Sequence, residues 1–259
     1  MRLALAQMEP LWENKEGNLK ASLKFLQEAK EKEADFILFP EMSMTGFSMH
    51  PERIGEDREN SRTLQFFQEK AREFEMYIGV GYVEYRLPKS YNSFAIISPS
   101  GEILADYQKI HPFSFGTESV HYVGGERIVT CQVEEFTVAP FICYDLRFPE
   151  IFQIASETAQ LIVVPVNWPV ERREHFMTLM KARAIENQCY MAGVNRVGHA
   201  RTLAYVGDSM VVDPYGKVIA EAGDGEKVIC VDLDLELVEK YRADFPMKKD
   251  RRKEIYVLK

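Results

Sequence analysis

The sequence predicts an α/β fold in which two sheets pack face to face and helices cover their outer faces. Two kinds of observation support this prediction. Stretches with helical spacing of apolar residues alternate along the chain with short apolar runs that are typical of buried strands. In addition, three segments of the first half resemble three segments of the second half in the same order, so the chain reads as two similar halves with one core.

The beginning of the chain predicts a strand, a helix and a second strand. Residues 2–7 alternate in strand fashion, and residues 14–18 suit the start of a helix. The charged run 30–33 ends this helix, whose buried face carries Leu19, Leu23, Leu26 and Ala29. The apolar run 36–39 suits a strand buried on both faces, and a proline ends it. Glu41 therefore lies at the exit of a buried strand.

The same order of elements occurs twice along the chain. A second helix over residues 62–75 is followed by strands predicted over residues 77–85, 92–98 and 102–107, with a turn at residues 99–101. The segments that resemble one another are 34–40 and 159–165, 71–79 and 182–193, and 95–101 and 210–216. Any two α/β halves share some of these features, and pseudo-symmetry is the interpretation that we favour.

Length and charge exclude several classes of protein. The 259 residues include 32 Lys plus Arg and 40 Asp plus Glu, which gives a net charge of −8 and a pI near 5.3. No basic block is longer than residues 248–252, which argues against binding to nucleic acid or to an anionic membrane surface. At this length we expect one domain over residues 1–259, with a C-terminal tail from about residue 240.

The cysteines and the N-terminal residues favour a reducing compartment. The apolar stretch at the N-terminus is too short for a signal segment or a membrane span. The four cysteines lack the spacing of a zinc site or a disulfide framework; they are Cys131, Cys143, Cys189 and Cys230. We therefore expect a cytoplasmic protein with free thiols and no metal.

Cys143 is the candidate nucleophile because of its place in the pattern. It lies within residues 137–147, where an apolar strand ends and polar residues begin. Active sites of α/β folds gather at such junctions, where the following backbone N–H groups can point at a substrate. Read alone, Cys143 also fits a buried structural cysteine. A catalytic thiol needs a nearby cation to hold its thiolate and a base to manage protons, because its ordinary pKa is about 8.5.

Lys109 and Glu41 are the candidates for this cation and this base. Lys109 follows a predicted strand and precedes the apolar stretch 110–115, which would strengthen its electric field. Glu41 lies at the edge of the core, where partial burial raises the proton affinity of a carboxylate and suits it to general base catalysis. Read alone, Lys109 also fits an ordinary surface lysine.

The three candidates fall in segments that together resemble a known family. The signature segments of the nitrilase superfamily, also called carbon–nitrogen hydrolases, resemble in order residues 39–47 (FPEMSMTGF), 107–111 (YQKIH) and 142–150 (ICYDLRFPE). The resemblance extends from Ala4 to about Gly216. It implies a four-layer α-β-β-α sandwich with two pseudo-symmetric halves, and it implies that the catalytic residues are Glu41, Lys109 and Cys143.

Further segments resemble the omega-amidase subgroup, which hydrolyses the terminal amide of 2-oxoglutaramate or 2-oxosuccinamate. These are residues 167–169 (NWP), 181–188 and 193–198. Glu118 matches the second glutamate that family members place beside the lysine. The segment around Cys143 is shared with amidases acting on deaminated glutathione, so it does not separate the two substrates. Pro112 departs from the Leu usual in the family, and Phe176 departs from the Trp usual in the subgroup, so the pocket and the exact substrate can differ.

The resemblance implies hydrolysis of a primary amide through a covalent thioester, without a metal or an organic cofactor. Cys143 attacks the carbonyl carbon while Glu41 transfers the protons. Lys109 and the backbone N–H of Tyr144 stabilise the oxyanion, and Glu118 holds Lys109 in place. The expected partners are a small amide and water, together with a second copy of the chain, since the family commonly forms dimers.

A 2-oxo acid amide also carries a carboxylate, so its pocket needs a cation. Arg172 is the candidate, because a guanidinium fork matches a carboxylate in two-point geometry. A solvated arginine within the charged run 171–174 is an equally good interpretation. Asn167 and Trp168, from the segment that resembles the omega-amidases, are expected to contact the substrate as well.

Several alternatives stay open. An amidase acting on deaminated glutathione or an N-carbamoyl compound would use the same chemistry. A non-catalytic binding protein could keep the fold, although it has no use for the three reactive groups together. A thiol–histidine pair or a metal site could join His111 or His121 to Cys143, although no carboxylate is recognisably placed to orient either histidine. Asp145 and Arg147 are expected to brace the turn through a local ion pair.

Overall fold

The structure is a computed structural model that describes residues 1–200 and 202–256. Its first sheet has the strand order β14-β1-β2-β3-β4-β5. The three strands β1, β2 and β3 are parallel, and the other neighbours pair antiparallel. The strands are β1 (Arg2–Gln7), β2 (Phe36–Leu38), β3 (Tyr77–Glu84), β4 (Tyr91–Ile97), β5 (Ile103–Gln108) and β14 (Lys227–Asp232).

The second sheet repeats this order. Read from β6, its order β6-β7-β8-β9-β12-β13 corresponds position by position to that of the first sheet. Again the three strands β7, β8 and β9 are parallel and the outer pairs are antiparallel. The strands are β6 (Cys131–Val133), β7 (Phe136–Pro140), β8 (Leu161–Val166), β9 (Tyr190–Asn195), β12 (Met210–Val212) and β13 (Val218–Glu221). The prediction of two similar halves is confirmed.

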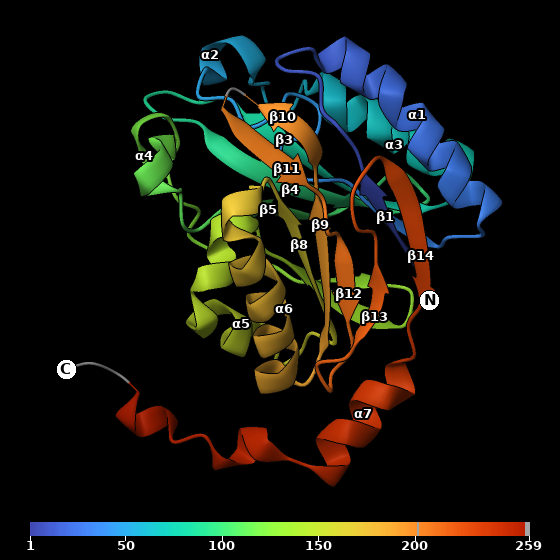
Figure 1. Cartoon of the computed structure of the whole chain (residues 1–259), viewed down its shortest axis with the longest axis vertical. Helices are drawn as coiled ribbons and strands as arrows, with labels where there is room; N and C mark the ends of the chain where they lie inside the picture. Colours follow the sequence, from blue (N-terminus) through green and yellow to red (C-terminus); the bar gives the residue numbers. More distant parts are fainter. Residues whose placement is uncertain (201, 257–259) are drawn as a thin grey trace.

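Side-chain alternation in the strands produces four layers. In β1, Leu3 and Leu5 face a core that the two sheets share, whereas Ala4 and Ala6 pack against the helices outside the first sheet. Figure 1 shows two helices on the outer side of each sheet. They are α1 (Lys15–Glu31) and α3 (Arg62–Phe74) on the first sheet, and α5 (Pro149–Ala155) and α6 (Arg173–Asn187) on the second.

The helices of the first half begin at capping residues. The side chain of Asn14 accepts a hydrogen bond from the backbone N–H of Gly17 at the start of α1, and Ser61 does the same for Leu64 at the start of α3. The five predicted strands and the helix over residues 62–75 occur within one residue of their expected bounds. The periodicity of the first half is therefore a reliable guide to its elements.

Shorter elements complete the described chain. The hairpin β10 (Val197–Ala200) and β11 (Leu203–Val206) forms a separate small sheet. The other elements are α2 (Pro51–Ile54), α4 (Glu118–His121), α7 (Leu235–Asp244) and the single turns η1 (Ser114–Gly116), η2 (Cys143–Arg147), η3 (Val170–Arg172), η4 (Met247–Asp250) and η5 (Lys253–Ile255). None of the described helices is long and apolar enough to cross a membrane.

The predicted C-terminal tail runs along the second half of its own chain. Arg242 in α7 donates hydrogen bonds to the main-chain carbonyls of Ala159 and Gln188 at 2.7 and 2.9 Å. Arg251 donates to the side-chain oxygen of Gln153 in α5 at 2.7 Å. In Figure 1 this segment passes below α5 and α6. The end of the predicted tail, residues 257–259, lies outside the described residues.

Candidate active site

Four polar residues follow strand ends at one edge of the two sheets. Glu41 comes after β2, Lys109 after β5, Cys143 after β7 and Asn167 after β8. The backbone N–H of Asn167 donates a hydrogen bond to the Glu41 carboxylate at 2.9 Å, so residues from facing sheets meet here. The side-chain amide of Asn167 also donates to the main-chain carbonyl of Glu41, at 2.8 Å. Glu41, at the end of a strand in the first sheet, is therefore held by Asn167, at the end of a strand in the second sheet.

Lys109 joins two buried carboxylates. Its Nζ donates to Oε1 of Glu41 at 2.9 Å and to Oε2 of Glu118 at 2.8 Å. All three side chains are at most 1% exposed. A buried charge is tolerated only when it is paired and hydrogen-bonded. Each of these three buried charges therefore depends on the contacts that Lys109 makes with the two carboxylates. Lys109 is therefore not the surface lysine that its sequence position alone allows.

Asn92 in β4 completes this network, and sequence reasoning missed it. Its amide nitrogen donates to Oε1 of both Glu41 and Glu118, each at 2.8 Å. Glu41 and Glu118 thus accept hydrogen bonds from the Asn92 amide as well as from Lys109. The signal in the sequence is a polar side chain at a strand position followed by the apolar run 94–97.

The network keeps Lys109 charged. Burial alone lowers the pKa of the Lys109 ammonium, but the carboxylates of Glu118 and Glu41 outweigh burial and raise this pKa. Burial also raises the pKa of Glu118, and the charge of Lys109 offsets only part of that effect. Lys109 therefore provides a fixed positive charge across the physiological pH range.

Cys143 sits in a strained turn at the start of η2. Its φ is 47°, a left-handed conformation that costs an L-residue roughly 1 to 3 kcal/mol. Asp145 holds the turn by accepting hydrogen bonds from the backbone N–H of Ile142 at 3.0 Å and from the Tyr107 hydroxyl at 2.7 Å. On one side of this turn, Cys143 lines a pocket.

Two expectations about this turn are wrong. Asp145 makes no ion pair with Arg147; the Arg147 guanidinium lies over the ring of Trp168, at 4.9 Å from the ring centre. A carboxylate does orient a histidine, because Nδ1 of His111 lies 2.8 Å from Asp145. His111 thus braces the turn, and His121 ends α4. Among the described residues there is no cluster suited to hold a metal ion.

The surroundings of Cys143 favour a protonated thiol at rest. Burial raises the pKa of Cys143, and the negative charge of Glu41 raises it further. The charge of Lys109 and a hydrogen bond from the Asn167 N–H lower this pKa, but they do not cancel the effects of burial and of Glu41. The expectation that a nearby lysine holds a standing thiolate is therefore not met. A base must remove the proton when the thiol attacks.

Glu41→Gln is expected to lower the pKa of Cys143, because it removes the neighbouring negative charge and keeps the shape of the side chain. The expected downward shift is roughly 1 to 3 pH units. It is measured as thiolate absorbance in the ultraviolet against pH, with variants that also carry Cys143→Ala as blanks. A midpoint that stays in place or rises would show that the charge of Glu41 does not act on this thiol.

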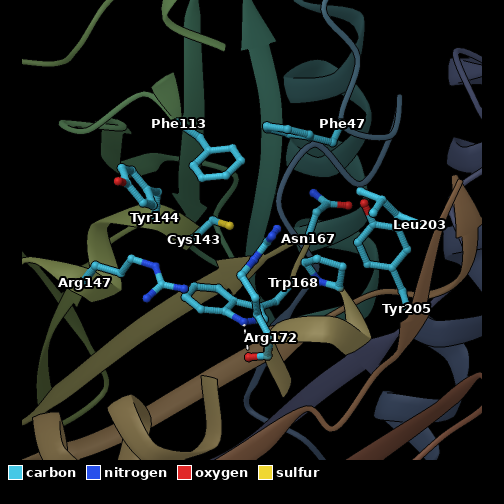
Figure 2. A pocket seen from close by; sticks show the side chains of 11 residues that line it. Phe47, Phe113, Cys143, Tyr144, Arg147, Asn167, Trp168, Arg172, Leu203 and Tyr205 are labelled. Carbon is cyan, nitrogen blue, oxygen red and sulfur yellow. Dashed lines mark hydrogen bonds between the residues drawn. The ribbon is translucent and has the colours of Figure 1, made fainter. Parts of the chain in front are cut away.

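A pocket opens beside Cys143 and contains two arginines (Figure 2). It encloses about 460 Å³ including its open mouth. Its lining consists of Phe47, Phe113, Cys143, Tyr144, Arg147, Asn167, Trp168, Pro169, Arg172, Leu203 and Tyr205. All four residues expected to contact substrate are in this lining, and Arg147, Phe47, Phe113, Leu203 and Tyr205 are additions that sequence reasoning missed.

Arg172 points into this pocket. In Figure 2 its side chain extends toward Cys143 and Asn167. Its guanidinium carbon lies 5.6 Å from the centre of the Phe113 ring. No carboxylate in the part of the chain that the structure describes forms an ion pair with Arg172. A half-buried arginine of this kind offers its charge to a ligand rather than to bulk solvent.

Trp168 forms the pocket wall next to Arg172. The indole N–H of Trp168 donates to the main-chain carbonyl of Arg172 at 2.7 Å, the dashed line in Figure 2. The ring of Phe176 packs behind Trp168, with the ring centres 5.8 Å apart. Phe176, one of the two departures from the family pattern, thus supports the pocket wall from behind.

The other departure, Pro112, precedes an aromatic residue of the opposite wall. The backbone N–H of Phe113 donates to Glu118 at 2.6 Å, which ties this loop to the buried network. The ring of Tyr144 packs edge-on against Phe113, with centres 4.9 Å apart. The loop that carries Pro112 therefore shapes the pocket directly.

Comparison with known proteins identifies the family. The sequence model of the carbon–nitrogen hydrolase family matches residues 2–243, which is nearly the whole chain. This chain is a carbon–nitrogen hydrolase. The expected family and the expected enzyme class, a hydrolase that acts on amides, are both confirmed.

Relatives of this hydrolase include proteins named as amidases. It is 30% identical to the 2-oxoglutaramate amidase of Bacillus subtilis (strain 168), with 90% of each chain covered. It is 32% identical to the omega-amidase YafV of Yersinia enterocolitica, with 98% of this chain and 97% of the relative covered. The crystal structure of XC1258 from Xanthomonas campestris, a CN-hydrolase superfamily protein with an arsenic adduct in its active site, superposes with a TM-score of 0.92 at 28% identity, covering 100% and 99% of the two chains. The predicted fold class is confirmed.

Proposed function

We propose that this hydrolase releases ammonia from the terminal amide of a small 2-oxo dicarboxylic acid monoamide, such as 2-oxoglutaramate or 2-oxosuccinamate. The observation that carries the proposal is a pocket in which Arg172, without an ion-pair partner among the described residues, shares the lining with Cys143. Such a pocket suits a substrate with an amide at one end and a carboxylate at the other. The relatives named 2-oxoglutaramate amidase and omega-amidase support this choice of substrate.

The first half of the proposed reaction forms a thioester. The Cys143 sulfur bonds to the amide carbon as Glu41 takes the thiol proton, because the thiol is protonated at rest. The tetrahedral intermediate then expels the amine, and Glu41 returns the proton to the leaving nitrogen, so ammonia departs as a neutral molecule. Asn167 has a buried side-chain oxygen without a hydrogen-bond partner in the described chain, and this oxygen can accept an N–H of the substrate amide.

The charge that develops on the carbonyl oxygen needs donors. Lys109 and the backbone N–H of Tyr144 are proposed to stabilise this oxyanion, and one such donor contributes roughly 3 to 4 kcal/mol in other hydrolases. Glu118 and Asn92 hold Lys109 and Glu41 in position through the buried network. Their part is to limit motion of the two reacting groups.

The second half of the reaction hydrolyses the thioester. Glu41 takes a proton from water, the hydroxide bonds to the acyl carbon, and the Cys143 sulfur leaves with a proton from Glu41. The products are the dicarboxylic acid and the free thiol, so atoms and protons balance without a redox step.

Arg172→Ala is expected to raise KM for 2-oxoglutaramate by roughly 10- to 100-fold, because a charge-assisted pair contributes about 1.5 to 3 kcal/mol. The KM for the uncharged amide butyramide should change little. Arg173→Ala is a matched control, since Arg173 pairs with Asp208 and is absent from the pocket lining. An equal rise in KM for both amides would show that Arg172 does not bind the carboxylate.

A substrate panel tests the proposed function directly. Ammonia release by the purified protein is compared for 2-oxoglutaramate, 2-oxosuccinamate, succinamate, deaminated glutathione, an N-carbamoyl amino acid and a nitrile. The first three should give the highest kcat/KM. A preference for deaminated glutathione or for the N-carbamoyl compound would replace the proposed substrate and leave the proposed chemistry in place.

Two further expectations stay predictions. The resemblance implies a homodimer, which the mass of the protein in solution would test. The expected cytoplasmic location also stays a prediction.

A further inference from the structure

The pocket contains a second polar side chain that the proposed chemistry does not use. Tyr205, from the hairpin strand β11, is only 6% exposed and lines the pocket with Cys143 and Arg172. Figure 2 shows its hydroxyl pointing toward Asn167. In the part of the chain that the structure describes, this hydroxyl makes no hydrogen bond. A hydroxyl at a pocket wall that has no partner among the described residues is available to a ligand.

The Tyr205 ring is held in place from behind. The guanidinium of Arg196 lies 4.6 Å from the centre of the ring, a cation–π contact. Arg196 is itself buried, and it donates to the main-chain carbonyls of Val197 and His199 at 3.0 and 3.2 Å. These contacts fix Arg196 against the hairpin, so the Tyr205 hydroxyl is presented to the pocket at a defined position.

The hydroxyl of Tyr205 has a proton to donate at physiological pH. Burial raises the pKa of Tyr205 to about 12; the charges of Arg196 and Arg172 oppose this effect, and the charge of Glu41 adds to it. The phenol therefore keeps its proton at physiological pH. A neutral phenol that faces a pocket suits a carbonyl oxygen, which can only accept.

The position of Tyr205 relative to Arg172 indicates which carbonyl oxygen of the substrate the hydroxyl can reach. Strand β11 packs against the turn η3, which carries Arg172. In a 2-oxo acid the oxo carbon is bonded directly to the carboxylate carbon. Once Arg172 holds the carboxylate, the oxo oxygen must lie beside it, so its donor must neighbour Arg172.

We propose that the hydroxyl of Tyr205 donates a hydrogen bond to the 2-oxo oxygen of the substrate and so selects 2-oxo acid amides over amides with a methylene group at that carbon. This inference rests on the proposed function, since it assigns a recognition role within the same site. It makes Tyr205 a specificity-determining residue and Arg196 a positioning residue behind it.

Tyr205→Phe tests the proposal, because it removes the hydroxyl and keeps the ring on Arg196. We compare kcat/KM for 2-oxoglutaramate and for glutaramate, which has a methylene group in place of the oxo group. The variant should lose roughly 5- to 10-fold on 2-oxoglutaramate and stay within about twofold of wild type on glutaramate. Tyr215→Phe is the matched control, because Tyr215 is exposed and stacks on Tyr241 outside the pocket.

The outcomes separate this inference from the proposed function. Equal losses on both amides, or no loss on either, overturn the role of Tyr205 while the proposed function stands. A wild-type enzyme that hydrolyses neither amide overturns the proposed function and this inference with it. The wild-type enzyme provides a second test. If its kcat/KM is the same for glutaramate as for 2-oxoglutaramate, the pocket has no hydrogen-bond donor for the oxo group.

Discussion

Cys143→Ala is expected to lower kcat for 2-oxoglutaramate by roughly 10⁴-fold or more, which is the scale seen when a nucleophile is removed from other hydrolases. The pocket lining contains no second thiol that could take over. The hydrogen bonds among Lys109, Glu41 and Glu118 do not involve the sulfur, so the rest of the site keeps its geometry. Steady-state ammonia release gives the rate.

The loss should be confined to the chemical step. Cys143→Ala should still bind the product 2-oxoglutarate with a Kd close to that of the wild-type protein, measured by calorimetry, because Arg172 remains in the pocket. Cys131→Ala is the matched control, since Cys131 lies in the outermost strand β6 of the second sheet. A Cys143→Ala variant that keeps more than about a tenth of wild-type kcat would contradict a cysteine nucleophile.

Lys109→Met is expected to affect both catalysis and folding. It removes a donor from the oxyanion, which lowers kcat by roughly 10²- to 10³-fold. It also leaves the buried carboxylates of Glu41 and Glu118 without their shared cation, which destabilises the fold by about 3 to 5 kcal/mol. For a chain of this length the expected fall in Tm is roughly 10 °C. Thermal unfolding and ammonia release measure the two effects separately.

A double variant separates the electrostatic cost from the catalytic role. Lys109→Met combined with Glu118→Gln removes one of the two unpaired charges, so it should recover much of the lost Tm and none of the lost kcat. If the single variant unfolds at the wild-type temperature, the buried network does not carry the charges that its geometry implies. If the double variant regains activity, Lys109 has no part in stabilising the oxyanion.

Much of the fold could be predicted because local signals agree with the tertiary structure. The helix that ends at the charged run 30–33 and the strand at residues 36–39 combine clear periodicity with clear end signals, and both occur as expected. The strand exits of Glu41, Lys109 and Cys143 could be located for the same reason. Residues that follow strands gather at sheet edges, so their proximity follows from the topology.

What could not be predicted depends on contacts between segments far apart in sequence. The partners of Asp145 are Tyr107 and His111, and no spacing rule connects them. Asn92 reads as one polar residue in a strand until Glu41 and Glu118 are both beside it. The placement of pocket residues from the hairpin β10–β11 depends likewise on tertiary packing.

The protonation of Cys143 shows how burial changes an electrostatic argument. From sequence, a nearby lysine implied a thiolate. In the structure, burial and the charge of Glu41 together outweigh the charge of Lys109 and raise the pKa of the thiol. Glu41 therefore has to accept the proton during attack, which is why its general base role is central to the proposed reaction.

Mass spectrometry of the enzyme quenched in acid during turnover would detect the proposed thioester on Cys143. The methyl ester of 2-oxoglutarate at the position of the amide is the best substrate for this purpose, because its better leaving group favours accumulation of the acyl-enzyme. We expect the peptide containing Cys143 to gain the mass of the acyl group and the other cysteine peptides to keep their mass. Rapid ester turnover with an initial burst of methanol, but without any acyl group on Cys143, would contradict the proposed thioester.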